Sequence, residues 1–475
     1  MKRAHGTVQP GLRWGPFTAR IPGIHLGFEG PEFAQGILLS AATGLALVPV
    51  MTTTLGLTFG QAVSMAFFHA LLVSQAPVLF GEPFATGWIT PALPFVLTLI
   101  TGDRFPTPDE KFQVMTALSL DLAIILLVLG TTGLGRRLID GIPRALKGAI
   151  IMGAAIAALE RVLVDDAPTA LFAMPWSMTV AIGVSLLLAF SAPLHRLKTR
   201  SRPLARLVSL GLLPGLVIGG VVGVLAGEVA YVVDGRSVIQ WGFVVPQLGA
   251  LIEKTSPLGI GFPSLGLMLS PDILSLAFMG YVILFGDMIT GVAVLDSVRA
   301  LRDDEIIPVD LTRTHLSTGI RNAIMGLFFP FFPTQGILWT GVHVIIANRW
   351  AEGRRAMDSM FSGIASYYMW GIPILYLILP LVTLLRPLLP IALALTLVLT
   401  GFACAYVSMD MVRDRAGRGT VLLGGMALAA FNPWLGLATA VVAVLLLTGW
   451  RDQYDEPTEP RSGARPQGPA GARAG

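Results

Sequence analysis

A carboxylate lies inside an apolar stretch of this chain, in the run Leu284-Phe285-Gly286-Asp287-Met288-Ile289-Thr290-Gly291. A carboxylate at bilayer depth costs about 2.5–3.5 kcal/mol on insertion scales, so such a residue usually has a function. Asp287 could bind a proton or help to hold Na⁺, and the alternative is a structural bond to neighbouring polar groups. We interpret Asp287 as a coupling residue.

Two other apolar stretches are interrupted, the first over Phe80 to Pro91 and the second over Phe331 to Gly341. Irregular backbone at bilayer depth is tolerated only where protein buries it or where it lines a cavity. A short apolar run follows each interruption and predicts a helix whose N-terminus carries about half a positive charge and favours an anion. We expect a substrate site formed by Thr86, Gly87, Trp88, Thr90, Thr334, Gln335, Gly336, Trp339 and Thr340.

Several of these polar and aromatic residues also have a purely structural explanation. The interruptions would equally suit the capping of kinked helices, and Trp88 and Trp339 more often pack than stack on a ligand. Asp121 is a candidate second coupling residue, although a structural hydrogen bond is the simpler interpretation. His69 and His343 lie in apolar stretches, where a histidine is more often a bonded core residue than a ligand.

Two charged residues near the interruptions have different expected roles. Arg321 either draws an anion inward or extends its side chain to the cytoplasmic surface, and we favour the surface position. Glu82 precedes the first interruption and is a candidate for a position on an entry path. The sequence has no Walker-type loop, no HExxH and no acidic metal cluster, which argues against ATP-driven transport and against an enzyme. We therefore expect no metal site and no cofactor apart from a coupling H⁺ or Na⁺.

The composition is that of a membrane protein. Of 475 residues, 54% are hydrophobic and 13% are charged, against about 25% charged in soluble proteins, and the mean hydropathy is +0.72. The net charge of +4 requires no nucleic acid, since the basic residues lie between apolar runs. One cysteine, Cys404, allows no internal disulfide, and residues 1–31 have no continuous apolar run, so we expect no cleavable signal peptide there.

Apolar stretches predict an all-α polytopic protein with fourteen transmembrane spans. The third and tenth spans are the interrupted ones, which is the same position in each half of a 7+7 inverted repeat. Such pairs of interrupted spans point to a transporter binding site. The expected spans are approximately 32–56, 58–79, 80–101, 113–134, 140–163, 170–194, 205–227, 271–298, 314–332, 331–348, 358–385, 387–411, 419–432 and 434–450.

The distribution of basic residues predicts the orientation. With fourteen spans and a cytoplasmic N-terminus, 27 of the 33 Lys and Arg residues lie in segments that face the cytoplasm. Cytoplasmic loops of membrane proteins carry such an excess. We expect a multi-pass protein of the cytoplasmic (inner) membrane with both termini in the cytoplasm.

Four sequence features resemble the uracil/xanthine permease (nucleobase–cation symporter-2) family, whose fold the sulfate permeases and bicarbonate transporters share. They are Gly44-Leu45-Ala46-Leu47-Val48-Pro49, Ala85 to Pro91, Phe285-Gly286-Asp287, and the stretch from Ser317 to Val342. The resemblance implies a core domain that moves against a gate domain like an elevator, often in a homodimer. It also implies a substrate between half-helices 3 and 10, facing span 8.

The sequence departs from that family in two places. The second acid of the uracil/xanthine permeases is missing, because the corresponding residues read Gly336-Ile337-Leu338-Trp339, and only about 25 residues follow the last span, too few for the regulatory domain of sulfate permeases. We therefore expect a divergent branch of the superfamily. The expected divisions are 1–31 (cytoplasmic segment), 32–134 and 271–385 (core), 135–228 and 386–450 (gate), 229–270 (extracytoplasmic loop) and 451–475 (disordered tail).

The expected function is secondary active transport of a small polar or anionic solute, nucleobase-like or a small anion, coupled to H⁺ or Na⁺. The alternatives are an exchanger or symporter for inorganic or carboxylate anions of the sulfate-permease type, and an ion channel. A channel would need a continuous polar pore, which the apolar spans do not suggest.

Overall fold

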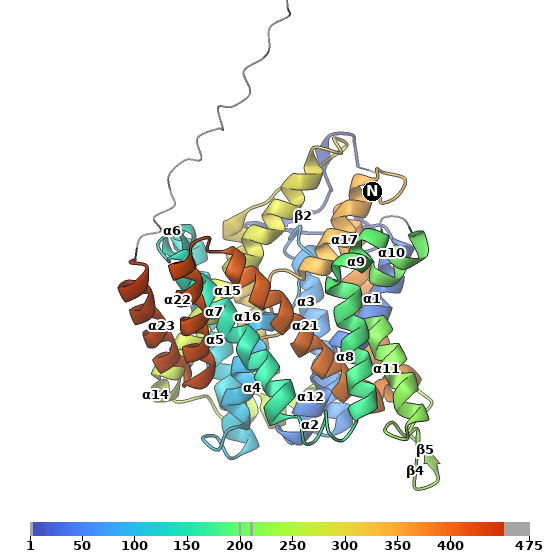
Figure 1. The fold of residues 1–475 in the computed structure, drawn as a ribbon. Helices are drawn as coiled ribbons and strands as arrows, with labels where there is room; N and C mark the ends of the chain where they lie inside the picture. The colour runs from blue at the N-terminus through green and yellow to red at the C-terminus, as the bar shows by residue number, and fades with distance from the viewer. Residues whose placement is uncertain (1–2, 199–200, 210–211, 451–475) are drawn as a thin grey trace, which may run out of the picture.

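The computed structural model describes residues 3–198, 201–209 and 212–450, and the predicted tail 451–475 lies outside them (Figure 1). The helices of the first half are α1 (Gly30–Thr43), α2 (Val48–Thr53), α3 (Phe59–Val78), η1 (Thr90–Ala92), α4 (Leu93–Thr101), α5 (Pro108–Thr132), α6 (Gly135–Asp140), α7 (Arg144–Glu160), η2 (Arg161–Asp165), α8 (Pro175–Phe190), α9 (Ala192–Lys198), α10 (Arg202–Ser209) and α11 (Leu213–Leu225).

The second half begins with three short helices and the long helix α15. Its helices are α12 (Leu248–Thr255), α13 (Pro257–Ile260), α14 (Leu265–Met268), α15 (Pro271–Arg299), α16 (Leu311–Phe328), α17 (Thr340–Ala351), α18 (Met360–Ala365), η3 (Ser366–Gly371), α19 (Ile372–Leu377), α20 (Leu379–Leu385), η4 (Arg386–Leu388), α21 (Leu389–Asp410), α22 (Arg415–Ala430) and α23 (Pro433–Leu447). The short strands are β1 (Thr7–Val8), β2 (Leu12–Trp14), β3 (Phe17–Ala19), β4 (Val232–Val233), β5 (Arg236–Ser237) and β6 (Glu305–Ile306).

Local sequence explains where the long helices begin. Thr58 caps α3 and Thr107 caps α5, and each forms a capping box with the Gln or Glu three residues later. Such a box satisfies two backbone N–H groups that would otherwise lack partners at a helix start. Pro108, at the first position of α5, has no N–H to satisfy there. These signals place the starts of the second and fourth predicted spans.

Several predicted spans are not single helices, the first and the eleventh among them. The first span is divided into α1 and α2, and the eleventh into α18, the π-helical segment η3, α19 and α20. Proline residues at the starts of α2, α19 and α20 account for part of this division, since proline begins a helix readily but breaks one internally. The predicted loop 229–270 contains the β4–β5 hairpin and α12 to α14.

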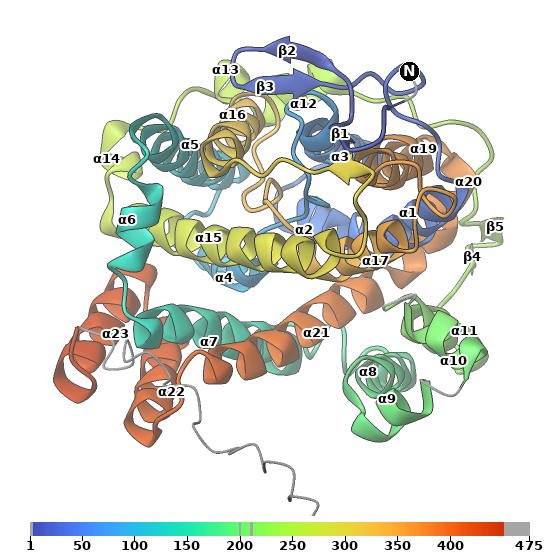
Figure 2. The ribbon, with the colours of Figure 1, turned by 90° about the horizontal axis from the view of Figure 1, so that it is seen from above.

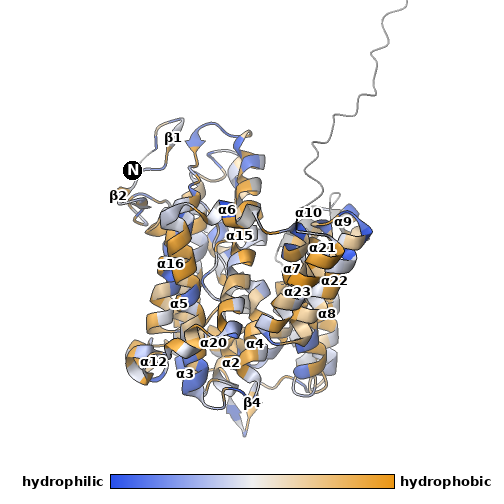
Figure 3. Ribbon diagram, turned by 90° about the vertical axis from the view of Figure 1, so that its left-hand side faces the viewer, coloured by the Kyte–Doolittle hydropathy of each residue, from blue (hydrophilic) through white to orange (hydrophobic). Residues whose placement is uncertain are grey.

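Three helical stretches of the described chain are long and apolar enough to cross a membrane: Pro108–Thr132, Pro271–Arg299 and Leu379–Asp410. Shorter apolar helices cover Thr90–Thr101, Pro175–Phe190, Leu213–Leu225 and Pro433–Leu447. Coloured by hydropathy, the helices are mostly apolar at mid-height, and polar segments gather at the two ends (Figure 3). The structure is therefore that of a helical membrane protein, while the count of fourteen spans stays a prediction.

The helices form two groups, seen from one end in Figure 2. One group contains α1 to α5 and α15 to α19. The other lies along one side and contains α7, α8, α11 and α21 to α23 (Figure 2). In the second group α7 packs against α21 and α22, and α8 packs against α11 and α21. The first group contains helices of the predicted core and the second helices of the predicted gate, and the division into two domains that move against each other stays a prediction.

Residues 3–29 form an N-terminal strap across one end of the first group. β1 pairs in parallel with β6, and β2 pairs with β3 as a hairpin. The hairpin is fixed to the end of α3, because the N–H of Arg20 donates to the carbonyl of Val78 at 2.6 Å and the indole of Trp14 donates to that of Leu79 at 2.8 Å. The guanidinium of Arg20 lies 3.8 Å from the centre of the ring of Phe361 in α18. The strap thus joins α3, β6 and α18.

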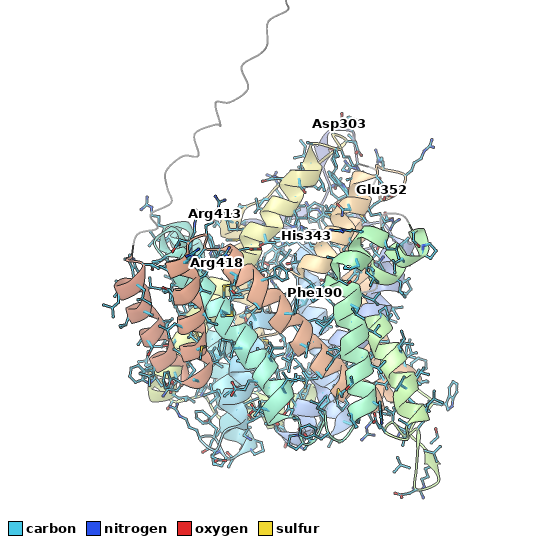
Figure 4. The ribbon with its side chains drawn as sticks, in the orientation of Figure 1. Phe190, Asp303, His343, Glu352, Arg413 and Arg418 are labelled. Carbon is cyan, nitrogen blue, oxygen red and sulfur yellow. The ribbon has the colours of Figure 1, made fainter. Side chains whose placement is uncertain are left out.

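An ion-pair cluster holds the strap to the loop after α15, near the labelled Asp303 in Figure 4. Hydrogen bonds from Arg302, with a second contribution from Arg3, hold the pKa of Asp304 well below its ordinary value of 3.8. Nitrogen Nη2 of Arg3 lies 2.8 Å from Oδ2 of Asp304, and Nη2 of Arg302 lies 3.1 Å from it. Because the folded-state pKa is depressed, ionised Asp304 stabilises the fold above pH 3.8 and loses this effect as the pH falls.

Asp304→Asn is therefore expected to lower the free energy of unfolding at pH 7 by about 2 kcal/mol, the worth of a hydrogen bond to a charged group. The stability of the variant should also fall less steeply between pH 5 and pH 3 than that of the wild type. Thermal unfolding across this pH range measures both effects. Asp303→Asn is the control, since the Asp303 side chain is 93% exposed. Equal acid profiles for the wild type and Asp304→Asn would contradict the prediction.

Candidate functional site

The two interruptions lie side by side and pair through their backbones. The N–H of Gly336 donates to the carbonyl of Gly87 at 2.7 Å, and that of Trp339 donates to Ala85 at 2.7 Å. The N–H of Ile89 donates to the carbonyl of Pro333 at 2.8 Å. The partners run in opposite directions along the chain, so the segments form a short antiparallel crossing, which we call the crossing. It satisfies backbone groups that no helix satisfies there.

Two glycines permit this close approach. A Cβ atom on Gly336 would lie 2.6 Å from the carbonyl oxygen of Gly87, and one on Gly87 would lie 2.8 Å from the Cβ of Trp339. Distances below 3.0 Å force a neighbour to move, and here the neighbours are backbone or are fixed next to it. Gly87 and Gly336 are therefore required by the geometry of the crossing, whatever else they contribute to the site.

A short helix begins at the end of each interruption. Thr90 and Pro91 start η1, which continues into α4, and Thr340 starts α17. No side chain caps either beginning; at η1, however, Pro91 has no N–H, and the N–H groups of Ala92 and Leu93 bond the backbone carbonyls of Ile89 and Thr90. Uncapped helix N-termini carry partial positive charge and accept anionic or electron-rich ligands. Thr90, Pro91, Thr340 and Gly341 all line one cavity.

This cavity has a volume of about 710 Å³ and lies between the two groups of helices. One wall contains the two helix beginnings and Asp287 of α15. The opposite wall is formed mainly by α21, with Leu212, which directly precedes α11. The residues of α21 that line it are Thr396, Leu399, Thr400, Ala403 and Cys404.

Asp287 reaches the cavity because α15 packs on both interruptions. Gly291 lies one turn further along α15 and touches both interruptions. A Cβ added to it would lie 2.9 Å from the Phe84 ring and 3.2 Å from a methyl group of Leu338. Within the described part of the chain, no hydrogen bond or ion pair to Asp287 is found. A cavity-lining carboxyl without a protein partner is available to a proton, a cation or a substrate, which fits the predicted coupling role.

The predicted site residues separate into two sets. Gly87, Trp88, Thr90, Trp339, Thr340 and Asp287 line the cavity, whereas Thr86, Thr334, Gln335, Gly336 and Asp121 do not. The hydroxyl of Thr86 donates to the carbonyl of Val73, and that of Thr334 donates to the carbonyl of Phe331. These two threonines support the interruptions from behind.

Asp121 is separate from both sets of predicted site residues. It is buried in α5, and its Oδ2 has no hydrogen-bond partner within the described chain. Its predicted part in coupling finds no support in this cavity. Among the described residues, no group of three His, Cys, Asp or Glu side chains is arranged to hold a metal ion.

A buried polar network lies behind the second interruption. Nη2 of Arg321 donates to the carbonyl of Gly336 at 2.8 Å, and Nη1 donates to the side-chain oxygen of Gln335 at 3.3 Å. The amide of Asn322 donates to the backbone carbonyl of Gln335 at 2.9 Å. Arg321 is 0% exposed, so the expected surface position of its side chain is wrong. Its apolar stem lies in protein, and Nη1 and Nη2 are hydrogen-bonded there, although Nε has no partner among the described residues.

Glu82 also differs from its expected place on an entry path. It is 1% exposed and bonded to α16, since Arg313 lies 3.3 Å from its Oε1 and the hydroxyl of Thr314 donates to its Oε2 at 2.6 Å. Buried carboxylates are normally paired in this way. Glu82 therefore fixes the first interruption to α16, and it does not line the cavity.

The two histidines have different positions. Nδ1 of His343, which is labelled near the centre of Figure 4, accepts a hydrogen bond from the N–H of Ala85 at 3.2 Å. His343 thus acts as a structural residue of the first interruption. His69 lines the cavity, and its Nε2 lies 2.8 Å from the carbonyl oxygen of Phe329. That carbonyl can only accept, so Nε2 carries the proton and Nδ1 is an acceptor in the neutral ring.

The sequence alone did not identify the wall of α21 or the tyrosines Tyr368 and Tyr376, which also line the cavity. The signal for α21 was weak, because Thr396 and Thr400 are ordinary residues of an apolar helix. Their spacing of four places both hydroxyls on one helix face. That spacing is the sign in the sequence that the two threonines, Thr396 and Thr400, face the same cavity.

Arg321→Met is expected to lower the free energy of unfolding by about 3 kcal/mol, because a buried polar group left without a partner costs about 1–3 kcal/mol and Arg321 serves both Gly336 and Gln335. Chemical unfolding of the purified protein measures the loss. Arg415→Met is the matched control, since Arg415 is exposed at the start of α22. Equal stabilities for the two variants would show that the network contributes nothing to the fold.

Comparison with known proteins identifies the fold. No family model matches the chain, and no curated protein matches its sequence. The solved transmembrane domain of the cyanobacterial bicarbonate transporter BicA aligns with a TM-score of 0.51 and 15% identity, over 87% of this chain and 97% of that one. The structure of SLC26A9 aligns with a TM-score of 0.51 and 14% identity, over 88% of this chain and 64% of that one.

At these identities the likeness establishes the fold. The chain has the membrane-transporter fold that BicA and SLC26A9 share. The fold that the sequence resemblance implied is therefore confirmed, while membership of the uracil/xanthine and sulfate permease superfamily stays a prediction.

Proposed function

We propose that this chain is a secondary active transporter for a small solute. Within the expected class of polar or anionic solutes, we propose an anion. The observation that carries the proposal is the cavity between the two groups of helices, with two uncapped helix beginnings and one unpaired carboxyl in its wall. Each helix beginning carries about half a positive charge, which attracts an anion. A solved structure with the same fold is a bicarbonate transporter, which supports an anion as the substrate class.

Coupling is proposed to occur through Asp287. An ionised Asp287 would compete with the substrate for the two positive helix beginnings, and like charges in one site disfavour each other. Protonation removes this competition and provides an O–H donor for the anion. Anion and proton would then bind together, so each transported monoanion would carry one proton. The same carboxylate would serve a Na⁺-coupled cycle by holding the cation, and the assay below distinguishes the two ions.

The alternation between the two sides of the membrane is proposed to be elevator-like. Residues 32–134 and 271–385 would form the moving core, and residues 135–228 and 386–450 the gate. The cavity lies where these parts meet, so sliding of the core past α21 would carry the bound anion. We further propose fourteen spans, a homodimer in the cytoplasmic membrane, and cytoplasmic termini. The N-terminus and the end of α23 lie at the same end of the molecule (Figure 1), as an even number of spans requires.

The test is uptake by reconstituted proteoliposomes with an internal pH-sensitive dye. An inward anion gradient is expected to acidify the lumen faster with the protein than in protein-free liposomes, and the added rate should not depend on Na⁺. Acidification that needs Na⁺ would assign coupling to Na⁺ and change this part of the proposal. Anion flux without any dependence on proton or Na⁺ gradients would replace the transporter by a channel or a uniporter.

A further inference from the structure

We propose that the cavity takes an organic monocarboxylate with an apolar body, in preference to an inorganic anion. This proposal rests on the proposed function, because it names the substrate class of the same site. Three properties of the cavity carry it, namely its apolar wall, its charge and its size.

The wall opposite the helix beginnings is largely apolar. Leu399 and Ala403 of α21 lie in it, and Met51 of α2 and Ile372 of α19 line the cavity from the first group of helices. An inorganic anion such as bicarbonate or sulfate has no apolar surface to bury and would lose hydration against such a wall. A solute with an alkyl or aryl group gains about 25 cal/mol for each Å² of apolar surface that it buries. The wall therefore favours a substrate that is apolar at one end.

The charge of the cavity matches one negative charge. Two helix beginnings together supply roughly one positive charge. Among the described residues that line the cavity there is no Lys or Arg, and Arg321 lies behind the crossing. A monoanion is thereby compensated, whereas a dianion would keep about one charge without compensation in a site that contains a further carboxyl, Asp287.

Polar groups with free bonding capacity lie in the same cavity. No described residue bonds to Asp287, and within the described chain His69, which is 3% exposed, is hydrogen-bonded only at Nε2. With Asp287 protonated, its O–H and the helix N–H groups are donors for a carboxylate. The neutral His69 ring leaves Nδ1 as an acceptor. These groups fit the head of a carboxylic acid with its proton, and the apolar wall receives the body.

The size of the cavity fits an organic molecule. Its volume of about 710 Å³ falls inside the range of roughly 300–1,000 Å³ that proteins use for organic ligands. Bicarbonate would fill a small part of it. Tyr368 and Tyr376, next to the apolar wall, provide flat surfaces that an alkyl chain or an aromatic ring can pack against.

The test measures binding of acetate, propionate, butyrate and valerate to the purified wild-type protein by titration calorimetry. The dissociation constant is expected to decrease about fourfold for each added methylene, the factor that corresponds to burial of one CH₂. Butyramide, which has the same body without charge, should bind at least tenfold more weakly than butyrate. Bicarbonate and sulfate should bind more weakly than valerate.

A pair of variants locates the effect in the wall. Leu399→Thr is expected to reduce the gain per methylene to below twofold while the affinity for acetate stays within twofold of wild type. Val407→Thr is the matched control, since Val407 is exposed on α21 and does not line the cavity. A Leu399→Thr variant with an unchanged gain per methylene would place the apolar body elsewhere and overturn the assignment.

The outcomes separate this inference from the proposed function. Equal dissociation constants across the series, or tighter binding of bicarbonate or sulfate, would overturn the organic substrate and leave anion transport in place. If none of the carboxylates or inorganic anions binds, and no anion gradient moves protons in proteoliposomes, the proposed function itself fails and this inference fails with it.

Discussion

Asp287→Asn is expected to abolish proton-coupled anion uptake in proteoliposomes, with at least a hundredfold loss of anion-driven acidification. Asparagine has nearly the shape of aspartic acid but cannot bind and release a proton. Because Asp287 lines the cavity and has no partner in the described chain, its replacement leaves no buried group without a bond. The variant should therefore fold with a thermal midpoint close to that of the wild type.

Asp121→Asn is the matched control, since it is the same substitution at a buried carboxyl that does not line the cavity. It is expected to retain uptake within about threefold. Wild-type-like concentrative uptake by Asp287→Asn would remove the coupling role from α15. If Asp121→Asn were the inactive variant, the coupling carboxyl would lie on α5, as the sequence also allowed.

Gly336→Ala is expected to eliminate substrate binding and to lower the thermal midpoint. The added Cβ would lie 2.6 Å from the carbonyl oxygen of Gly87 and 2.9 Å from the carbonyl carbon of Trp88, so the two backbones must separate. Separation weakens the three backbone bonds of the crossing, at about 1 kcal/mol each. The beginnings of η1 and α17 then lose their shared position, and we expect at least a hundredfold loss of affinity.

Gly183→Ala is the control for this substitution, because no atom lies within 4 Å of the corresponding Cβ on α8. It should bind substrate as the wild type does and be slightly more stable, since alanine favours a helix over glycine by about 1 kcal/mol. Titration calorimetry and thermal unfolding of both variants measure the effects. A Gly336→Ala protein with normal affinity would mean that the crossing does not position the site.

The sequence predicted the interruptions well because their signals are local. Pro91 after Thr90, and the polar run from Thr334 to Gly341, cannot continue an apolar helix, so each marks a break without reference to the rest of the fold. The lone carboxyl of Asp287 was equally visible against its apolar neighbours. In the structure these three features meet at one cavity.

The partners of buried charges were not predictable in the same way. Arg321 and Glu82 both lie near the ends of apolar stretches, where a charged side chain normally reaches water. Their real partners, Gly336 for one and Arg313 for the other, belong to segments that only the fold brings near. The internal divisions of the first and eleventh spans were missed for a related reason, since each piece is apolar and hydropathy does not reveal where an apolar helix stops.

The crossing separates what holds this site from what selects its substrate. Its three bonds join peptide groups only, and every residue type has such groups except for the missing N–H of proline. Side chains at Trp88, Trp339 and Leu399 can therefore be exchanged without loss of the frame that carries them. A new specificity can be introduced by substitutions facing the cavity alone, and the two glycines are the fixed points that such a redesign has to keep.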